Sequence, residues 1–295
     1  MNFWVALFIA FFAGAFIGYL QTFVFGKLPE KWLQDYGVKE TDPDFRLSKR
    51  MQFFPHGVIS ALFCVAIYML FVGFCYSNWI NPLGIFHLLA VLLSTPIIVI
   101  VMMSDRLNRI IPDECSIALA LIGVLCIAGD FFEPGLWFSP EAAWYAPLLN
   151  RIIAALVGGG FLWLLNFLTM TFMGKEGMGQ GDMKLLASVG LIVGCYGVVI
   201  VLYVGIIAAL FFAVPLFIRK RMRLAAEKKE IMNAENPFEK RAEIAARKAA
   251  IHFADDPDYL AFGPFLAFGT SVFLALEPFF YNYLHDSLDV LGLLF

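Results

Sequence analysis

The 295-residue sequence contains few charged residues. Only 15% are Asp, Glu, Lys or Arg, whereas 61% are hydrophobic and 32 are Phe. About a quarter of the residues of a soluble globular domain are charged, so the composition excludes a water-soluble enzyme. The long apolar runs predict an all-α polytopic membrane protein, because a helix satisfies its own backbone hydrogen bonds in lipid. The net charge of −3 gives no indication of a nucleic-acid partner.

The sequence also lacks residues at metal-ligand spacing. Its five cysteines form no C-x-x-C pair and lie in or beside apolar runs. They indicate neither a zinc ribbon nor a disulfide framework, and their positions favour buried thiols that act as small apolar side chains. The four histidines are scattered along the chain. We therefore expect no metal site.

Apolar stretches of about 20 residues, the length that crosses a bilayer as a helix, predict the transmembrane segments. Six such stretches lie at residues 3–25, 53–76, 83–104, 115–132, 147–173 and 261–283. A longer run at residues 185–217 contains Gly-Cys-Tyr-Gly at 194–197 and predicts a short helix, a turn and a second helix. The expected total is about eight transmembrane helices.

The positions of the basic residues predict the orientation of the chain. With eight spans, 20 of the 21 Lys and Arg residues fall on one side of the membrane, and Arg151 falls on the other. Basic residues accumulate in cytoplasmic loops, so both termini are predicted to be non-cytoplasmic. The chain then divides into a first transmembrane helix (1–25), a cytoplasmic loop without zinc cysteines (26–52), a membrane core (53–218), a charged cytoplasmic insertion (219–258), and a last transmembrane helix with a C-terminal tail (259–295).

The charged insertion contains a predicted helix. Residues 236–239, Asn-Pro-Phe-Glu, supply an N-cap, a proline at the first position and an acid at the third. Glu243 and Arg247 are four residues apart and are expected to pair. Phe238 shares one face with three alanines. That face either rests on the membrane or a neighbouring helix, or belongs to a solvated charged helix.

Three aspartates near membrane depth are the candidates for chemistry, since burying a carboxylate is costly unless it is paired or protonated. Asp105 ends the third span, Asp113 precedes the fourth, and Asp182 precedes the sixth. Asp105 and Asp182 are both predicted on the cytoplasmic side, at the ends of helices that can pack together. Two adjacent carboxylates share a proton, so one can activate water while the other polarises a peptide carbonyl. This pair therefore predicts aspartic-protease chemistry.

The residues around these aspartates suggest supporting roles. Glycines alternate with other residues before Asp182, so the chain there can turn sharply and approach another helix or an extended peptide. Asp113 is expected to be the N-cap of the fourth span. Lys184 either tunes the acidic pair electrostatically or anchors the sixth span at the cytoplasmic surface.

Four short blocks resemble the type IV prepilin peptidase family, in the family's order. Two of them carry the aspartates: Gly-Gln-Gly-Asp-Met-Lys-Leu-Leu-Ala at 179–187 is similar to the GxGD motif, and Asp105 with Pro-Asp at 112–113 is similar to the D-x6-P-D block. The others are Lys-Leu-Pro at 27–29 and Gly-Pro-Phe-Leu-Ala at 263–267. The resemblance implies a catalytic pair of Asp105 and Asp182, with backbone support from Gly179 and Gly181 and further support from Asp113 and Lys184.

The resemblance also implies an activity and a location. Family members are multi-pass proteins of the bacterial inner membrane that remove the leaders of type IV prepilins and type II secretion pseudopilins, alongside pilus or secretion assembly machinery. Proteolysis there needs no cofactor. Many members also methylate the new N-terminus with S-adenosylmethionine. This chain departs from the usual pattern because it lacks the paired C-x-x-C motifs in loop 26–52 and has a longer insertion at 219–258, so methyl transfer stays an open expectation.

Two other functions are compatible with the composition. An ion-coupled transporter also uses intramembrane carboxylates, although its sites lie near the bilayer midplane, whereas these aspartates are predicted at one face. A catalytically silent assembly component of a pilus or secretion system would keep the fold without the chemistry.

Overall fold

The computed structural model describes residues 2–35, 37–38, 41, 45–77, 85–132, 143–174, 177–249 and 260–290, and these residues form helices and loops without a β-strand. The elements are α1 (Phe3–Lys27), η1 (Glu30–Trp32), η2 (Phe53–Gly57), α2 (Val58–Ser77), α3 (Ile85–Asn108), α4 (Asp113–Phe132), α5 (Ala146–Met173), α6 (Gln180–Met232), α7 (Pro237–Ala249) and α8 (Gly263–Val290).

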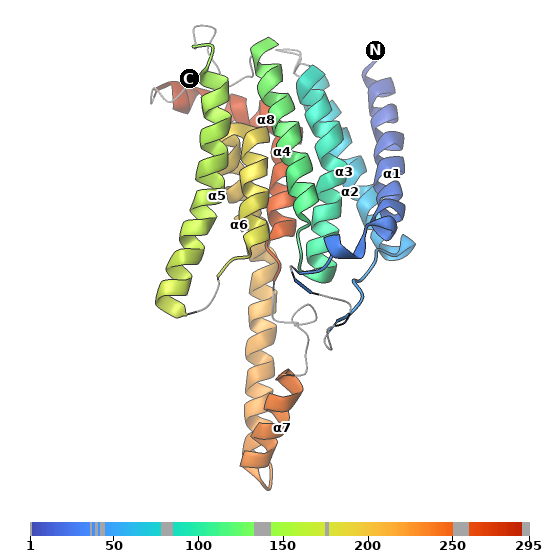
Figure 1. Ribbon diagram of the computed structural model, residues 1–295. Coiled ribbons are helices and arrows are strands. Elements are labelled where there is room, and N and C mark those ends of the chain that lie inside the picture. The colour runs from blue at the N-terminus through green and yellow to red at the C-terminus, as the bar shows by residue number, and fades with distance from the viewer. Residues whose placement is uncertain are drawn as a thin grey trace.

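Seven helices among the described residues are long and apolar enough to cross a membrane. Six of them begin and end within a few residues of the predicted spans, which confirms an all-α polytopic membrane protein. α1 begins and α8 ends at the same end of the bundle (Figure 1), as expected for termini on one side of the membrane. The side that faces the cytoplasm stays a prediction.

The seventh helix, α6, breaks at Gly194, which divides it into a first part (180–193) and a second part (195–232). Gly194 has φ 72° and ψ −177°, and a positive φ of this size favours glycine. The Asn150 side chain of α5 lies against the break, because a Cβ added at position 194 would lie 2.7 Å from Asn150 Nδ2. Asn150 Oδ1 also accepts the backbone N–H of Cys195 at 3.0 Å. The predicted turn is therefore confirmed.

The two parts of α6 run in opposite directions. The first part packs on α5, where a Cβ on Gly190 would lie 2.7 Å from the backbone of Ala154. The second part packs on α8, where a Cβ on Gly205 would lie 3.1 Å from the carbonyl oxygen of Phe265. Phe265 is in the first turn of α8, so the chain has returned to the end of the bundle from which the first part started.

The two parts also differ in length. The first part has 14 residues, or about 21 Å of helix, which is shorter than the roughly 30 Å hydrocarbon core of a bilayer. The second part stays apolar as far as Ile218 and then becomes basic from Arg219 onward. Seven apolar helices, one of them with two antiparallel parts, agree with the expectation of about eight spans.

Beyond Arg219, the second part of α6 continues without a break and projects from the bundle with α7 beside it (Figure 1). Two ion pairs join the two helices: Lys240 Nζ lies 3.0 Å from Glu230 Oε1, and Lys248 Nζ lies 2.6 Å from Glu227 Oε2. The charged insertion therefore contains a helical hairpin that continues directly from a membrane helix.

The predicted start of α7 is confirmed. Asn236 Oδ1 accepts the backbone N–H groups of Phe238 at 3.2 Å and Glu239 at 3.3 Å, and the expected Glu243–Arg247 pair forms at 2.9 Å. Of the alternatives left open for the face of Phe238, contact with a neighbouring helix is not observed among the described residues, because Phe238 is 82% exposed. The buried apolar residue of α7 is Ile244.

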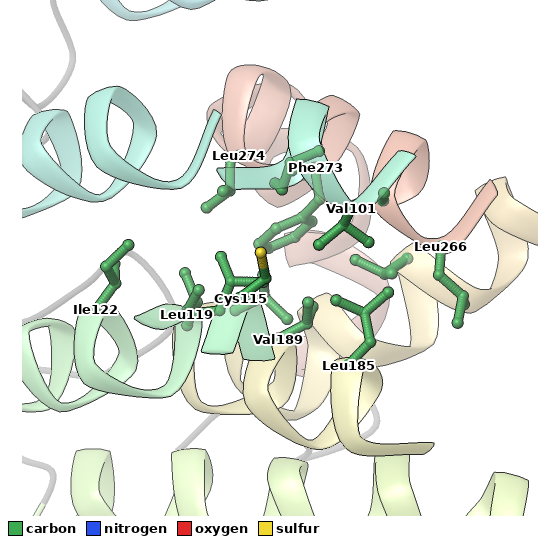
Figure 2. Packing of buried hydrophobic residues seen from close by; sticks show 14 of the residues in the cluster. Val101, Cys115, Leu119, Ile122, Leu185, Val189, Leu266, Phe273 and Leu274 are labelled. Carbon is green, nitrogen blue, oxygen red and sulfur yellow. The ribbon is translucent and has the colours of Figure 1, made fainter. Parts of the chain in front are cut away.

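The core of the bundle joins α3, α4, the first part of α6, and α8 (Figure 2). Their buried side chains interdigitate between the ribbons, and the labelled ones are Val101, Cys115, Leu119, Ile122, Leu185, Val189, Leu266, Phe273 and Leu274. α1 pairs mainly with α2, where Gly14 and Gly18 let the two backbones approach closely. The core therefore lies directly beside the helix ends that carry Asp105 and Asp182.

The loop between α1 and α2 is tied to the end of α3. Lys49 donates its backbone N–H to Asn108 Oδ1 at 2.8 Å, and Asn108 Nδ2 returns a hydrogen bond to the Lys49 carbonyl at 3.2 Å. Within the loop, burial by itself raises the pKa of Glu30. Hydrogen bonds from Ser48, Gln34 and Arg50 outweigh this effect and lower the pKa to about 2. Glu30 therefore remains ionised and holds the loop together.

Candidate active site

Asp105 lies in the last turn of α3 and is only 6% exposed. Its carboxylate accepts a hydrogen bond from the backbone N–H of Gly263, the first residue of α8. A Cβ added at Gly263 would lie 2.6 Å from Asp105 Oδ2, so a larger residue there would collide with the carboxylate. Glycine at position 263 thus allows α8 to begin directly against Asp105.

Asp182 is the third residue of α6 and is 8% exposed. Its carboxylate accepts the backbone N–H of Gly179, the N-cap residue. This is the reciprocal bond of a capping box, in which an acid at the third helical position satisfies the N-cap amide. Asp182 Oδ1 is buried and has no hydrogen-bond partner among the described residues. The helix start therefore orients the side chain and leaves one buried carboxylate oxygen without a hydrogen bond from the described residues.

The two aspartates meet where the C-terminus of α3 faces the N-terminus of α6, and their charges act on one another. Ile111 lies between the glycines that border them. A Cβ on Gly263 would lie 2.8 Å from Ile111 Cδ1, and a Cβ on Gly181 would lie 3.0 Å from Ile111 Cβ. The structure therefore brings together the two aspartates that the sequence predicts as a pair. Two buried carboxylates at this proximity favour a shared proton.

The alternating glycines before Asp182 serve different purposes. Gly181 packs tightly on Ile111, and Gly177 lies close to Thr169 of α5, whose Oγ1 would be 2.3 Å from an added Cβ. Gly179 has φ −70° and ψ 146°, which any residue adopts, and the nearest atom to an added Cβ is 3.6 Å away. Nothing in its described surroundings requires glycine at position 179.

Asp113 and Lys184 form an ion pair that ties α4 to α6. Lys184 Nζ donates to both Asp113 oxygens, at 2.8 Å and 3.0 Å. Asp113 is the first residue of α4, and Pro112 supplies the first carbonyl acceptor of that helix. Asp113 is therefore a first-turn acid rather than the expected N-cap. The two roles left open for Lys184 stay predictions, and the structure adds that its ammonium is paired with Asp113.

Two charged features escaped the sequence interpretation. Arg109, directly after α3, has a left-handed φ of 62°, and its charge acts on Asp105. Far from the aspartates, the buried Arg151 binds Asp130 with two nitrogens, at 2.5 Å and 2.9 Å, and also donates to the carbonyls at 191–192 that end the first part of α6. In the predicted topology, Arg151 was the one basic residue on the side opposite the other 20, and this exception was a signal that its side chain is largely buried.

No group of three His, Cys, Asp or Glu side chains that could hold a metal ion occurs within the described ranges. The expectation of no metal stays a prediction, because parts of the chain lie outside those ranges. We assign no residues to S-adenosylmethionine, and methyl transfer also stays a prediction.

Residues 92–214, which contain both aspartates, match the model of the type IV leader peptidase family. The match covers 123 of the 295 residues and makes this segment similar to that family. The segment runs from α3 into the second part of α6, so the family match covers the helices that carry both aspartates but not α8. No solved structure matches the chain.

Curated relatives of the type IV leader peptidase segment share moderate identity with the chain. A prepilin leader peptidase/N-methyltransferase of Aeromonas salmonicida strain A449 is 31% identical over 131 residues, which cover 44% of this chain and 40% of the relative. The protein of the same name from Burkholderia pseudomallei strain 1026b is 30% identical over 159 residues, covering 54% and 44%. The one from Neisseria gonorrhoeae is 27% identical over 148 residues, covering 50% and 45%. The chain thus spans less than half the length of these relatives.

Proposed function

We propose that the protein is an intramembrane aspartic peptidase of the bacterial inner membrane that removes the leaders of type IV prepilins and type II secretion pseudopilins. The observation that carries this proposal is the buried pair of Asp105 and Asp182, held by two backbone N–H groups at facing helix ends. The pair lies in the segment that matches the type IV leader peptidase family. Relatives named prepilin leader peptidase/N-methyltransferase support the choice of substrate.

The geometry suits hydrolysis of a peptide bond by two carboxyl groups. The ionised carboxylate removes a proton from water while the water oxygen bonds to the scissile carbonyl carbon, and the protonated carboxyl gives its proton to the carbonyl oxygen. The tetrahedral intermediate then collapses as the C–N bond breaks. The first carboxyl delivers its proton to the leaving nitrogen, and the second regains a proton from a hydroxyl of the intermediate. Both groups end in their starting states.

The position of the pair favours a peptidase over an ion-coupled transporter. Both carboxylates lie at helix ends, and the N-terminus of α6 directs its backbone N–H groups toward the site, where developing negative charge is stabilised. A coupling-ion site for a cation would instead present unwound backbone carbonyl oxygens to the ion, whereas the backbone groups recorded at these two carboxylates are N–H groups.

The test is co-expression of the full chain with an epitope-tagged prepilin, with leader removal followed by gel shift. We expect wild type to process the substrate and Asp105→Asn and Asp182→Asn to abolish processing, because asparagine preserves size but cannot exchange a proton. Asp113→Asn is the matched control and should process almost normally. Undiminished processing by either dyad variant would refute the assignment, and a folded wild type that leaves prepilin uncut would favour a silent assembly role.

The methyl-transfer expectation needs a separate measurement. Mass spectrometry of the mature substrate's N-terminus distinguishes a methylated amine from a free one. We expect leader removal to occur whether or not methylation does, since the proposed peptidase chemistry uses only the two carboxyl groups and water.

A further inference from the structure

Arg109 occupies a backbone position that usually belongs to glycine. It directly follows the last residue of α3, and its N–H donates to the Asp105 carbonyl at 3.0 Å. This hydrogen bond and the φ of 62° show that α3 ends in a residue with left-handed backbone conformation. Glycine is favoured at such a helix end because it has no Cβ and avoids the steric penalty. Arg109 is the only non-glycine residue with positive φ in the part of the chain that the structure describes. A side chain at this position therefore needs a reason beyond ending the helix.

The side chain of Arg109 lies where it affects the acidic pair. Its Nε is buried, and its charge acts on Asp105, one helical turn earlier. A guanidinium stays protonated throughout the pH range of a protein. The left-handed turn thus places a permanent positive charge beside one of the two carboxylates.

The charges around the two aspartates are unequal. Asp105 faces the guanidinium of Arg109 on its own segment and a backbone N–H from α8. Asp182 faces the carboxylate of Asp105 across the helix contact and the N–H of its own N-cap residue. The other charges at the contact of α4 and α6, Asp113 and Lys184, neutralise one another in their ion pair. Among the described residues, the charge recorded as acting on Asp105 is thus a cation, and the charge recorded as acting on Asp182 is an anion.

We infer that Arg109 is a positioning residue that assigns different roles to the two aspartates: it keeps Asp105 ionised as the base that takes the proton from water and leaves Asp182 as the acid that protonates the carbonyl oxygen. This inference rests on the proposed peptidase function. Asp182 is suited to the acid role because its buried Oδ1 accepts no hydrogen bond among the described residues and can therefore carry the proton that is given to the carbonyl oxygen.

A purely structural role for Arg109 makes a different prediction. A basic residue after a helix C-terminus stabilises the helix through its dipole, which would alter thermal stability and leave the pH dependence of catalysis unchanged. The pH dependence of leader removal therefore separates the two explanations.

The experiment measures the rate of prepilin cleavage against pH with purified full-length wild type, Arg109→Gln, Arg109→Lys and Arg109→Gly. An opposite charge near a carboxylate favours its ionised form by about one pH unit or more. We therefore expect the acid limb of the rate profile to move to higher pH by about that amount in Arg109→Gln, so that the rate on that limb falls about tenfold. Arg109→Lys keeps the charge and should keep the wild-type profile.

Arg109→Gly separates the charge from the backbone strain. It relieves the left-handed conformation, so its thermal stability should equal or exceed that of wild type, yet its acid limb should move as in Arg109→Gln. An unmoved limb in both neutral variants, a displaced limb in Arg109→Lys, or a stable Arg109→Gly that is inactive at every pH would overturn the inference. If wild type itself fails to cleave prepilin, the proposed function fails first; if wild type cleaves and the limb stays in place, only the role of Arg109 is refuted.

Discussion

Replacing either glycine of the Gly-Gln-Gly-Asp motif by alanine tests how closely the site is packed. At position 181, the new methyl would lie 3.0 Å from Ile111 Cβ, closer than ordinary van der Waals contact, so Ile111 or the start of α6 must move by a few tenths of an ångström. Ile111 cannot yield easily, because its Cδ1 already lies close to Gly263 on the other side. The displacement therefore falls on Asp182, the next residue.

The expected loss of cleavage rate in Gly181→Ala follows from the cost of overpacking and from the displacement of Asp182. Overpacking of this kind costs about 1–3 kcal/mol, and a misplacement of about 1 Å reduces catalysis about 100-fold. For a shift of a few tenths of an ångström, we expect Gly181→Ala to lower the rate of leader removal about tenfold. Gly179→Ala should process within about twofold of wild type, because the added methyl meets only ordinary contacts and the backbone conformation suits alanine.

The assay is the initial rate of prepilin cleavage by equal amounts of purified protein, with melting temperature measured in parallel to exclude unfolding. Equal rates for the two alanine variants, or a greater loss in Gly179→Ala, would refute the packing argument.

Three further predictions concern neighbouring features. Gly263→Ala should abolish prepilin cleavage in the gel-shift assay, because the new methyl would lie 2.6 Å from a carboxylate oxygen of the acidic pair. A double-mutant cycle of Asp113→Asn and Lys184→Met in melting experiments should give a coupling of about 0.2–1 kcal/mol, as expected for a partly exposed ion pair. Glu30→Gln should be less stable than wild type at neutral pH, and the difference should disappear as the pH falls from about 4.3 toward 2, because a carboxylate with a depressed pKa loses its stabilising effect when it is protonated.

For each of these predictions, one experimental result would contradict the reasoning. Gly160→Ala is the control for position 263, since no atom lies within 4 Å of its added Cβ; cleavage that is equally weak in both variants would remove the steric explanation. A coupling near zero between Asp113 and Lys184 would mean that their contact does not stabilise the protein. A constant stability difference between Glu30→Gln and wild type across the acid range would show that the hydrogen bonds of Glu30 do not depend on its charge.

The sequence predicted those parts of the fold that depend on local composition. Apolar run length located the membrane helices, because a span must be about as long as the bilayer is thick. The glycine at position 194 located the reversal in α6, and the order of the helices placed Asp105 and Asp182 at facing ends. These inferences use only the residues near each position and the fact that successive helices cross the membrane in opposite directions.

Features that depend on tertiary pairing were not predictable in this way. The interaction of Arg151 with Asp130 requires that α4 and α5 meet at a particular height, and the burial of Ile244 depends on α7 folding back along α6. The ion pair of Lys184 with Asp113 likewise joins residues 71 positions apart. Single-sequence periodicity carries no information about such partners, so the sequence analysis did not identify Ile244 as the buried residue of α7.

The reversal of α6 at Gly194 also determines how deep the chemistry lies. Measured from the turn, Asp182 is 12 residues away on the first part, about 18 Å, whereas the basic residues of the second part begin 25 residues away, about 37 Å. Asp182 is therefore 13 residues nearer to the turn than the first basic residue of the second part is. Under the proposed peptidase function, the scissile bond of a substrate has to reach carboxylates that lie alongside the apolar stretch of the second part, short of its basic end.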